Sequence, residues 1–231
     1  ISFSREEVRQ RVIPTYMGLI SEIDDNIGRL MAFLKNSGRL EDTLIIFTSD
    51  HGDYLGDHWL GEKEMFHEES LRIPMIVCDP DSRSDATRGT IDDRLVEAID
   101  PAPTFVDALG GRPVGHLLEG RSLLPLLRRT IDEQWRSTVF SEADYAFRGA
   151  RHSLQLAADE TRAYMIRTEK WKYVSFDGFP PQLSDLETDP QELTDLGRSD
   201  RYEAVRTEME AAIAGWMRQR RLRTTIDHET I

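Results

Sequence analysis

The sequence predicts an α/β fold with a mainly parallel sheet and flanking helices, followed by a small antiparallel sheet and a terminal helix. Through about residue 135, helical segments are followed by short, continuous apolar runs, which are typical of strands buried on both faces of a parallel sheet. Beyond that point the strand-like runs alternate in polarity, as in an antiparallel sheet with one wet face. We therefore expect two parts, residues 1–135 and residues 136–231.

A long amphipathic helix is expected first, over residues 5–37. Pro14 should kink or restart it, because proline removes a helix hydrogen bond, and Gly38 suits the C-terminal cap. The apolar side chains recur at three- and four-residue spacing, which is the helical period. They are Tyr16, Leu19, Ile20, Ile23, Ile27, Leu30, Met31 and Leu34.

Two short apolar runs, residues 43–48 and 75–78, are expected to be strands buried on both faces of a sheet. A polar loop, residues 49–53, directly follows the first run. Residues 81–93 are rich in polar and helix-breaking residues and should form a surface loop. A short helix should follow at residues 104–109, after two prolines.

The second part reads as strands and one helix. Residues 138–142 and 182–186 are candidate strands, and residues 163–168 and 170–174 alternate in polarity as an antiparallel hairpin does. A final helix is expected from Asp200 to about Arg221. Its apolar face comprises Val205, Met209, Ile213 and Trp216.

The composition excludes several classes of partner. The 29 basic and 42 acidic residues give a net charge of −13, which disfavours nucleic acid and anionic membranes. The single cysteine, Cys78, precludes an internal disulfide and agrees with a reducing compartment, so we expect a cytoplasmic protein. The chain begins at Ile1 without an initiator methionine, and we expect it to be the later part of a longer protein.

The strongest chemical feature is the polar loop after the first strand. Asp50 and His51 lie at the carboxyl end of that strand, where ligands bind in open α/β sheets. A carboxylate beside an imidazole suits a divalent cation, and Lys63 further along can supply a fixed positive charge for an anionic substrate. On the residues alone, an Asp-His pair is also typical of a plain turn, and Lys63 of a solvated surface lysine. Two ligands do not complete a site, because magnesium takes about six donors.

These segments resemble a known family. Residues 43–53 (TLIIFTSDHGD) are similar to the metal-binding segment of sulfatases in the alkaline phosphatase superfamily, and residues 16–34 to the helix before it. Residues 52–63 (GDYLGDHWLGEK) resemble most closely the phosphonate monoester hydrolase branch. Residues 171–173 (WKY) and 186–193 (LETDPQEL) resemble the small C-terminal sheet region. The resemblance implies the C-terminal part of an alkaline phosphatase-like fold.

The resemblance also implies roles for individual residues. Asp50 and His51 match the paired ligands of a divalent metal ion, namely Mn, Ca or Mg. Lys63, 13 residues after Asp50, matches the catalytic lysine that contacts the phosphoryl or sulfuryl oxygens. His58 is a candidate substrate-binding residue, and His67 a candidate supporting one. Either histidine can instead be purely structural.

The chain also departs from the family pattern. Such enzymes use a cysteine in a Cys-x-Pro-x-Arg motif, located upstream of the region matched here together with further acidic ligands. Residues 78–83 (CDPDSR) mimic that motif, but Ser82 stands where arginine is required, and the segment follows the Asp-His pair. We therefore interpret Cys78 as a buried cysteine at a strand end and not as the nucleophile. The chain should carry half of an active site and be inactive alone.

The function expected is part of a metal-dependent hydrolase of phosphonate monoesters, phosphodiesters or sulfate esters, with a small anionic ester as substrate. An arylsulfatase or choline-sulfatase type enzyme is the alternative within the enzyme class. A non-catalytic metal-binding or assembly protein of the same fold is the alternative outside it. The basic cluster at residues 218–223 is interpreted as a solvated helix end. The alternative for this tail, which the resemblance implies, is that it supports the contacts of a homo-oligomer.

Overall fold

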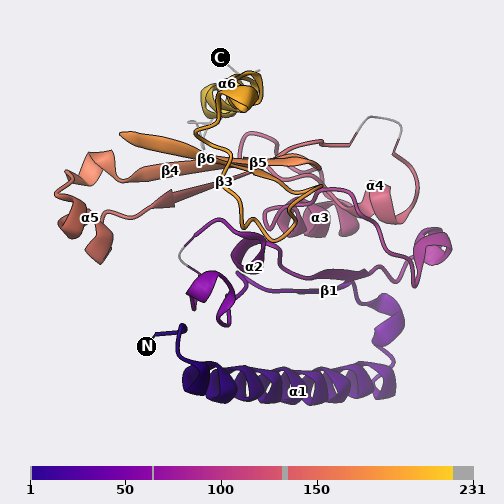
Figure 1. Ribbon diagram of the computed structural model, residues 1–231. Helices are drawn as coiled ribbons and strands as arrows, with labels where there is room; N and C mark the ends of the chain where they lie inside the picture. Colours follow the sequence, from indigo (N-terminus) through magenta and orange to yellow (C-terminus); the bar gives the residue numbers. More distant parts are fainter. Residues whose placement is uncertain (1, 64, 132–134, 221–231) are drawn as a thin grey trace. The chain divides into compact units, whose positions relative to one another are not determined.

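The computed structural model describes residues 2–63, 65–131 and 135–220 (Figure 1). The chain forms two compact units, and each is described by itself. One unit comprises Ile1–Ile91, Thr104–Arg112 and Ser122–Asp132, and the other comprises Asp92–Pro103, Pro113–Arg121 and Glu133–Ile231. A domain boundary near residue 135 stays a prediction.

The first unit carries the long N-terminal helix and a two-stranded sheet. Its elements in chain order are α1 (Glu6–Asn36), η1 (Leu40–Asp42), β1 (Ile45–Thr48), η2 (Asp57–Trp59), α2 (Glu68–Leu71), β2 (Met75–Cys78), η3 (Ser82–Thr87) and α4 (Leu124–Leu127). A further helix, α3 (Pro101–Ala108), contributes residues to both units. The surface loop predicted for residues 81–93 thus contains one short 3-10 helix, and the short helix predicted at residues 104–109 begins three residues earlier.

Helix α1 confirms the predicted helix and continues through Pro14 without a break. None of its residues is buried within the described chain, and Phe33 keeps 64% of its surface exposed. The apolar stripe that the sequence predicts is therefore present on the helix, but the described residues cover it only in part, and Leu30 keeps 53% of its surface exposed. Exposed apolar side chains at this density are typical of a surface that packs against other protein.

Strands β1 and β2 pair antiparallel, with Ile45 opposite Cys78 and Thr48 opposite Met75. The parallel direction predicted for this part of the sheet is wrong for this pair. The connection of residues 49–74 is long enough for a parallel crossover, but it contains only short helical segments and returns the chain in the opposite direction. Burial on both faces is also wrong within the described residues, because Ile76 is 63% exposed.

The second unit is a four-stranded antiparallel sheet in the order β3-β4-β5-β6, with one helix on its face (Figure 1). The elements are β3 (Val139–Asp144), α5 (Gly149–Leu154), η4 (Ala158–Glu160), β4 (Arg162–Arg167), β5 (Trp171–Phe176), β6 (Phe179–Asp185), η5 (Asp200–Tyr202) and α6 (Glu203–Gln219). The predicted strands and terminal helix are confirmed. The predicted end of that helix at Arg221, and residues 221–223 of the basic cluster, lie outside the described residues.

The core of the second unit lies between the sheet and α6. It contains Ile166, Tyr173, Leu183, Met209 and Ile213. Two of these residues belong to the apolar helix face that the sequence predicts, and the sheet residues come from β4, β5 and β6. The helical period of three to four residues and the strand period of two therefore bring both apolar faces together. Among the described helices, none has the length and apolar character that crossing a membrane requires.

Candidate functional site

Three of the predicted site residues lie together just beyond β1. The Lys63 ammonium is 2.7 Å from His51 Nε2, and Asp50 Oδ2 is 3.4 Å from the same nitrogen. On the other side of the ring, His51 Nδ1 lies 2.7 Å from the carbonyl oxygen of Gly52. Because a carbonyl oxygen only accepts, Nδ1 carries the proton, and Nε2 presents a lone pair. That lone pair accepts from Lys63 here, and it is the donor that a divalent cation takes from histidine.

Asp50 stays ionised over the physiological range. Desolvation by neighbouring atoms raises the pKa of its carboxyl group. Hydrogen bonds from the backbone amides of Asp50 and His51, and the electrostatic effect of the His51 ring and the Lys63 ammonium, lower that pKa by more, so it lies below its usual value. The side chain is 83% exposed. The carboxylate is therefore anionic and accessible, as a ligand for a hard cation must be.

Ser70 of α2 connects the two segments that carry His51 and Lys63. Its backbone carbonyl accepts a hydrogen bond of 2.8 Å from Gly52 N, and its hydroxyl donates one of 3.2 Å to the carbonyl oxygen of Lys63. Ser70 is buried. Gly52 permits the close approach, because a Cβ atom there would lie 1.9 Å from the carbonyl oxygen of Glu69.

The loop between these segments folds back on itself. Tyr54 N donates to the Glu62 carbonyl, and Gly56 N to the Leu60 carbonyl, at 3.1 and 2.9 Å. Four of its non-glycine residues have positive φ angles, which cost about 1 kcal/mol or more each. They are Leu55, His58, Trp59 and Glu62. Backbone strain of this kind persists only where surrounding contacts hold it, and it concentrates at functional sites.

His58 lies in a half-buried cluster formed by this loop and the start of α2. Its ring stacks on His67 at 4.0 Å between centroids, and Tyr54 meets both rings edge-on. Its Nε2 is 3.6 Å from Glu69 Oε2. These contacts of His58 involve neither His51 nor Lys63. A direct contact between His58 and substrate stays a prediction.

Sequence reasoning missed Ser70, Glu69 and Tyr54 as parts of this region. Ser70 and Glu69 lie in a short acidic and polar stretch that reads as an ordinary helix start. Tyr54 reads as one more apolar residue of the loop, although its hydroxyl lies 2.8 Å from His67 Nδ1. No local pattern distinguishes these side chains, because their partners are 7 to 18 residues away along the chain.

Cys78 ends β2 and is exposed, so the predicted burial of this thiol is wrong within the described residues. The alternating faces of a strand place Cys78 on the same outward face as Ile76. Its sulfur lies 3.8 Å from a guanidinium nitrogen of Arg88. That Cys78 is not the nucleophile stays a prediction.

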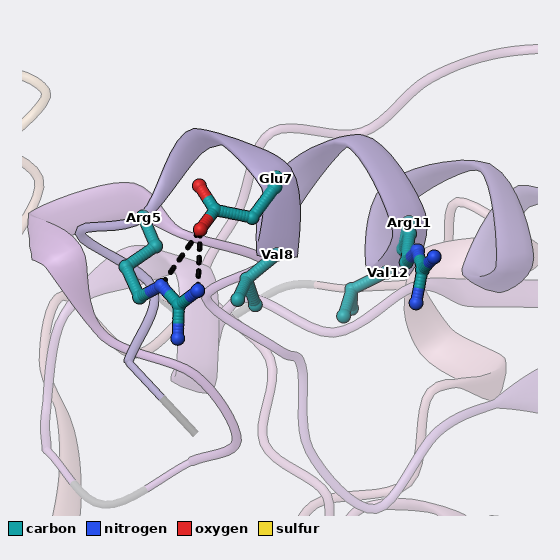
Figure 2. A pocket seen from close by; sticks show the side chains of 5 residues that line it. All are labelled: Arg5, Glu7, Val8, Arg11 and Val12. Atoms are coloured by element: carbon teal, nitrogen blue, oxygen red, sulfur yellow. Dashed lines mark hydrogen bonds and ion pairs between the residues drawn. The ribbon is translucent and has the colours of Figure 1, made fainter.

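A separate open pocket lies along the first turns of α1 (Figure 2). Its lining residues are Arg5, Glu7, Val8, Arg11 and Val12. The Arg5 guanidinium donates a hydrogen bond of 2.9 Å from Nε to the Glu7 carboxylate, so these two charged groups are paired with each other. None of the predicted site residues lines this pocket, so it is not the predicted metal and substrate site.

Two known protein-family models match this chain. The family model described as "N-sulphoglucosamine sulphohydrolase, C-terminal" matches residues 56–219. The model described as "Type I phosphodiesterase / nucleotide pyrophosphatase" matches residues 14–94. The chain belongs to the sulfatase family of the alkaline phosphatase superfamily. The resemblance first seen in the loop after β1 is thereby confirmed over most of this sulfatase-family chain.

Individual relatives agree with this assignment. The chain is 41% identical over 202 residues to the multifunctional alkaline phosphatase superfamily protein PehA of Trinickia caryophylli, covering 86% of this chain and 38% of that protein. It is 36% identical over 203 residues to arylsulfatase K of Gallus gallus, covering 84% of this chain and 35% of that protein. The chain thus spans less than two fifths of the length of these relatives.

Solved structures confirm the fold. The phosphonate monoester hydrolase of Agrobacterium radiobacter superposes with a TM-score of 0.82 at 37% identity, covering 89% of this chain and 41% of that one. The phosphonate monoester hydrolase of Silicibacter pomeroyi also superposes with a TM-score of 0.82, at 26% identity, covering 93% and 43%. The sulfatase-family chain therefore has the predicted alkaline phosphatase-like α/β fold.

Proposed function

We propose that this chain contributes Asp50, His51 and Lys63 to the active site of a metal-dependent hydrolase of phosphonate monoesters, phosphodiesters or sulfate esters. The observation that carries the proposal is the convergence of these three side chains on His51 Nε2, at 2.7 Å from Lys63 and 3.4 Å from Asp50. The similarity to a phosphonate monoester hydrolase and to an arylsulfatase supports the same reaction class.

The donor chemistry of Asp50 and His51 fits a divalent cation such as Mn, Ca or Mg. Asp50 offers an ionised, exposed carboxylate, and His51 offers Nε2 with its tautomer set by the Gly52 carbonyl. When bound, the cation would supply positive charge that polarises a phosphoryl or sulfuryl oxygen. The described residues contain no group of three or more His, Cys, Asp and Glu side chains suited to hold a metal ion. We therefore propose that further ligands come from outside these residues.

Lys63 provides the fixed positive charge of the proposed site. Phosphoryl and sulfuryl transfer are catalysed mainly by positioning and by positive charge around the equatorial oxygens of a tetrahedral centre. Ser70 holds the Lys63 backbone next to Gly52, so the ammonium is preorganised beside the metal-binding pair. Preorganisation matters because a donor already in place needs no reorganisation during the reaction.

The nucleophile is proposed to come from elsewhere as well. The 231 residues contain one cysteine, and its surrounding sequence does not match Cys-x-Pro-x-Arg. We propose that the isolated chain does not hydrolyse these esters, since a cation with two protein ligands is weakly held. The purified chain, assayed on an aryl phosphonate and an aryl sulfate with added manganese, tests this point. Metal-dependent turnover by the isolated chain would contradict it.

The decisive experiment replaces Lys63 in the full-length gene product. Lys63→Ala should lower kcat by about 10²–10³-fold, the loss typical of one preorganised donor. Lys35→Ala, which removes an exposed lysine of α1, is the matched control and should leave kcat unchanged. Comparing aryl phosphonate with aryl sulfate as substrates separates the phosphonate hydrolase from the arylsulfatase alternative. Equal kinetics for Lys63→Ala and Lys35→Ala would contradict the proposed role of Lys63.

A further inference from the structure

Glu69 presents a buried carboxylate oxygen that needs a partner. Its Oε2 is buried and has no hydrogen-bond partner among the residues that the structure describes. His58 Nε2, a ring nitrogen that can donate a hydrogen bond, lies 3.6 Å from this oxygen, just beyond hydrogen-bond distance. Buried carboxylate oxygens are normally paired, and active-site hydrogen bonds that are long without substrate often tighten in the complex. The two groups are therefore placed to form a charge-assisted hydrogen bond.

The His58–Glu69 pair joins two segments that otherwise meet through Ser70. His58 lies in the strained loop before Lys63, with a positive φ of 50°. Glu69 lies on α2, next to Ser70, which binds the backbone of both Gly52 and Lys63. A change in the distance between loop and helix would therefore move Lys63 relative to His51.

The rings around the pair restrict its geometry. His67 stacks on His58 with an interplanar angle of 16°, and the buried Tyr54 lies edge-on to both. Stacking fixes the plane of the His58 ring, so its nitrogen keeps its direction toward Glu69. An apolar pair could fill the same space at a lower desolvation cost. A directional polar contact in this position is better explained by alignment of the loop than by stability.

We propose that His58 and Glu69 form a positioning pair that holds the Lys63 backbone in place beside the Asp50-His51 segment. The proposal rests on the proposed function, and it assigns His58 an indirect role in place of the substrate contact expected from the sequence. A shift of about 1 Å in a group near the chemistry can cost about 10²-fold in rate. Loss of the pair should accordingly lower kcat more than it changes KM.

The experiment compares four variants of the full-length gene product. Glu69→Gln keeps the shape but removes the charge, and His58→Phe keeps a stacking ring but removes the donor. His58→Gln retains a donor, and the double variant His58→Phe/Glu69→Leu replaces the polar pair by an apolar one. Glu208→Gln, at an exposed position of α6, is the matched control. Each protein is measured for thermal unfolding, for kcat and KM with manganese, and for amide hydrogen exchange in residues 52–63.

Glu69→Gln and His58→Phe should lower kcat about 10- to 100-fold with KM within about twofold, and speed exchange in residues 52–63. His58→Gln should recover most of kcat, and the double variant should recover the melting temperature without recovering kcat. A double variant that recovers both would show a merely structural pair and overturn the proposal.

Two further outcomes separate this inference from the proposed function. If the unmodified gene product turns over neither ester, the proposed function fails, and hydrogen exchange alone decides the inference. Faster exchange in residues 52–63 of Glu69→Gln, with Glu208→Gln unchanged, would then still support the positioning pair. Unchanged exchange in Glu69→Gln overturns it whatever the activity, because Glu69→Gln is nearly isosteric and should fold.

Discussion

Replacing Gly52 by alanine should disturb the site without changing any of its functional side chains. A Cβ atom at Gly52 would lie 1.9 Å from the carbonyl oxygen of Glu69 and 3.0 Å from its carbonyl carbon. Both are backbone atoms of α2, so a side-chain rotation cannot relieve the clash. The backbones must separate by about 1.5 Å to reach an ordinary van der Waals contact, since cores are close-packed. That movement stretches the 2.8 Å hydrogen bond from Gly52 N to the Ser70 carbonyl.

The expected magnitude follows from this displacement. Overpacking of this kind costs typically about 1–3 kcal/mol of unfolding free energy. For a chain of this size, each kcal/mol lowers the melting temperature by about 2–4 °C, which gives a loss of about 2–12 °C. His51 is adjacent to Gly52 and bonded to its carbonyl, so the ring moves as well. A displacement near 1 Å predicts a loss of about 10²-fold in kcat.

The assay is thermal unfolding of Gly52→Ala beside Gly149→Ala, followed by turnover of the full-length gene product. Gly149, in α5, has no atom within 4 Å of an added Cβ, and its φ is not positive. Its substitution should change stability by no more than about 0.5 kcal/mol. If Gly52→Ala melts within about 2 °C of the unsubstituted protein and keeps its turnover, the close approach of Gly52 to α2 is wrong.

Three other predictions concern the two units. Leu183→Ala, at a fully buried core position, should lower the unfolding free energy by about 2–5 kcal/mol in urea titrations; a loss below about 1 kcal/mol would contradict the packing. Burial by itself raises the pKa of the Asp79 carboxyl group. Hydrogen bonds from Arg128 and Ser84 lower this pKa by more, so it lies below its usual value of 3.8. Because the folded-state pKa is depressed, the stabilisation is fully present above the unfolded-state pKa of about 4 and is lost as the pH falls from there through the lower folded-state pKa. Asp79→Asn should flatten the acid side of the stability profile below about pH 4, and an unchanged slope would refute this. Cys78→Ala should leave turnover of the full-length gene product unchanged, and loss of activity would restore Cys78 as a candidate nucleophile.

Much of the fold follows from short-range sequence patterns. The period of α1, the alternation in β4 and β5, and the apolar face of α6 are local properties, and each predicted element forms close to its expected bounds. The Asp50-His51 pair is equally local, because it directly follows a recognisable strand. Lys63 joined the predicted site through its spacing from Asp50 in a segment that resembles sulfatases, and the structure brings its ammonium to His51.

The antiparallel pairing of β1 and β2 could not be predicted from the sequence, because a short apolar run is equally compatible with a parallel and an antiparallel neighbour. The exposure of α1 and of Ile76 was equally hidden, since periodicity identifies an apolar face but not what covers it. Cys78 shows the same limit, because burial depends on neighbours that are distant in sequence.

By itself, the sequence determined the elements, the family and the three converging side chains, because these depend on residue type, spacing and local period. Only the tertiary structure decided that Ser70 joins the two loop segments and that His58 turns toward Glu69. Those contacts depend on the path of a strained loop, which local propensity does not encode. The physical reason is that the role of a side chain depends on the groups it contacts, and the tertiary structure determines which groups those are.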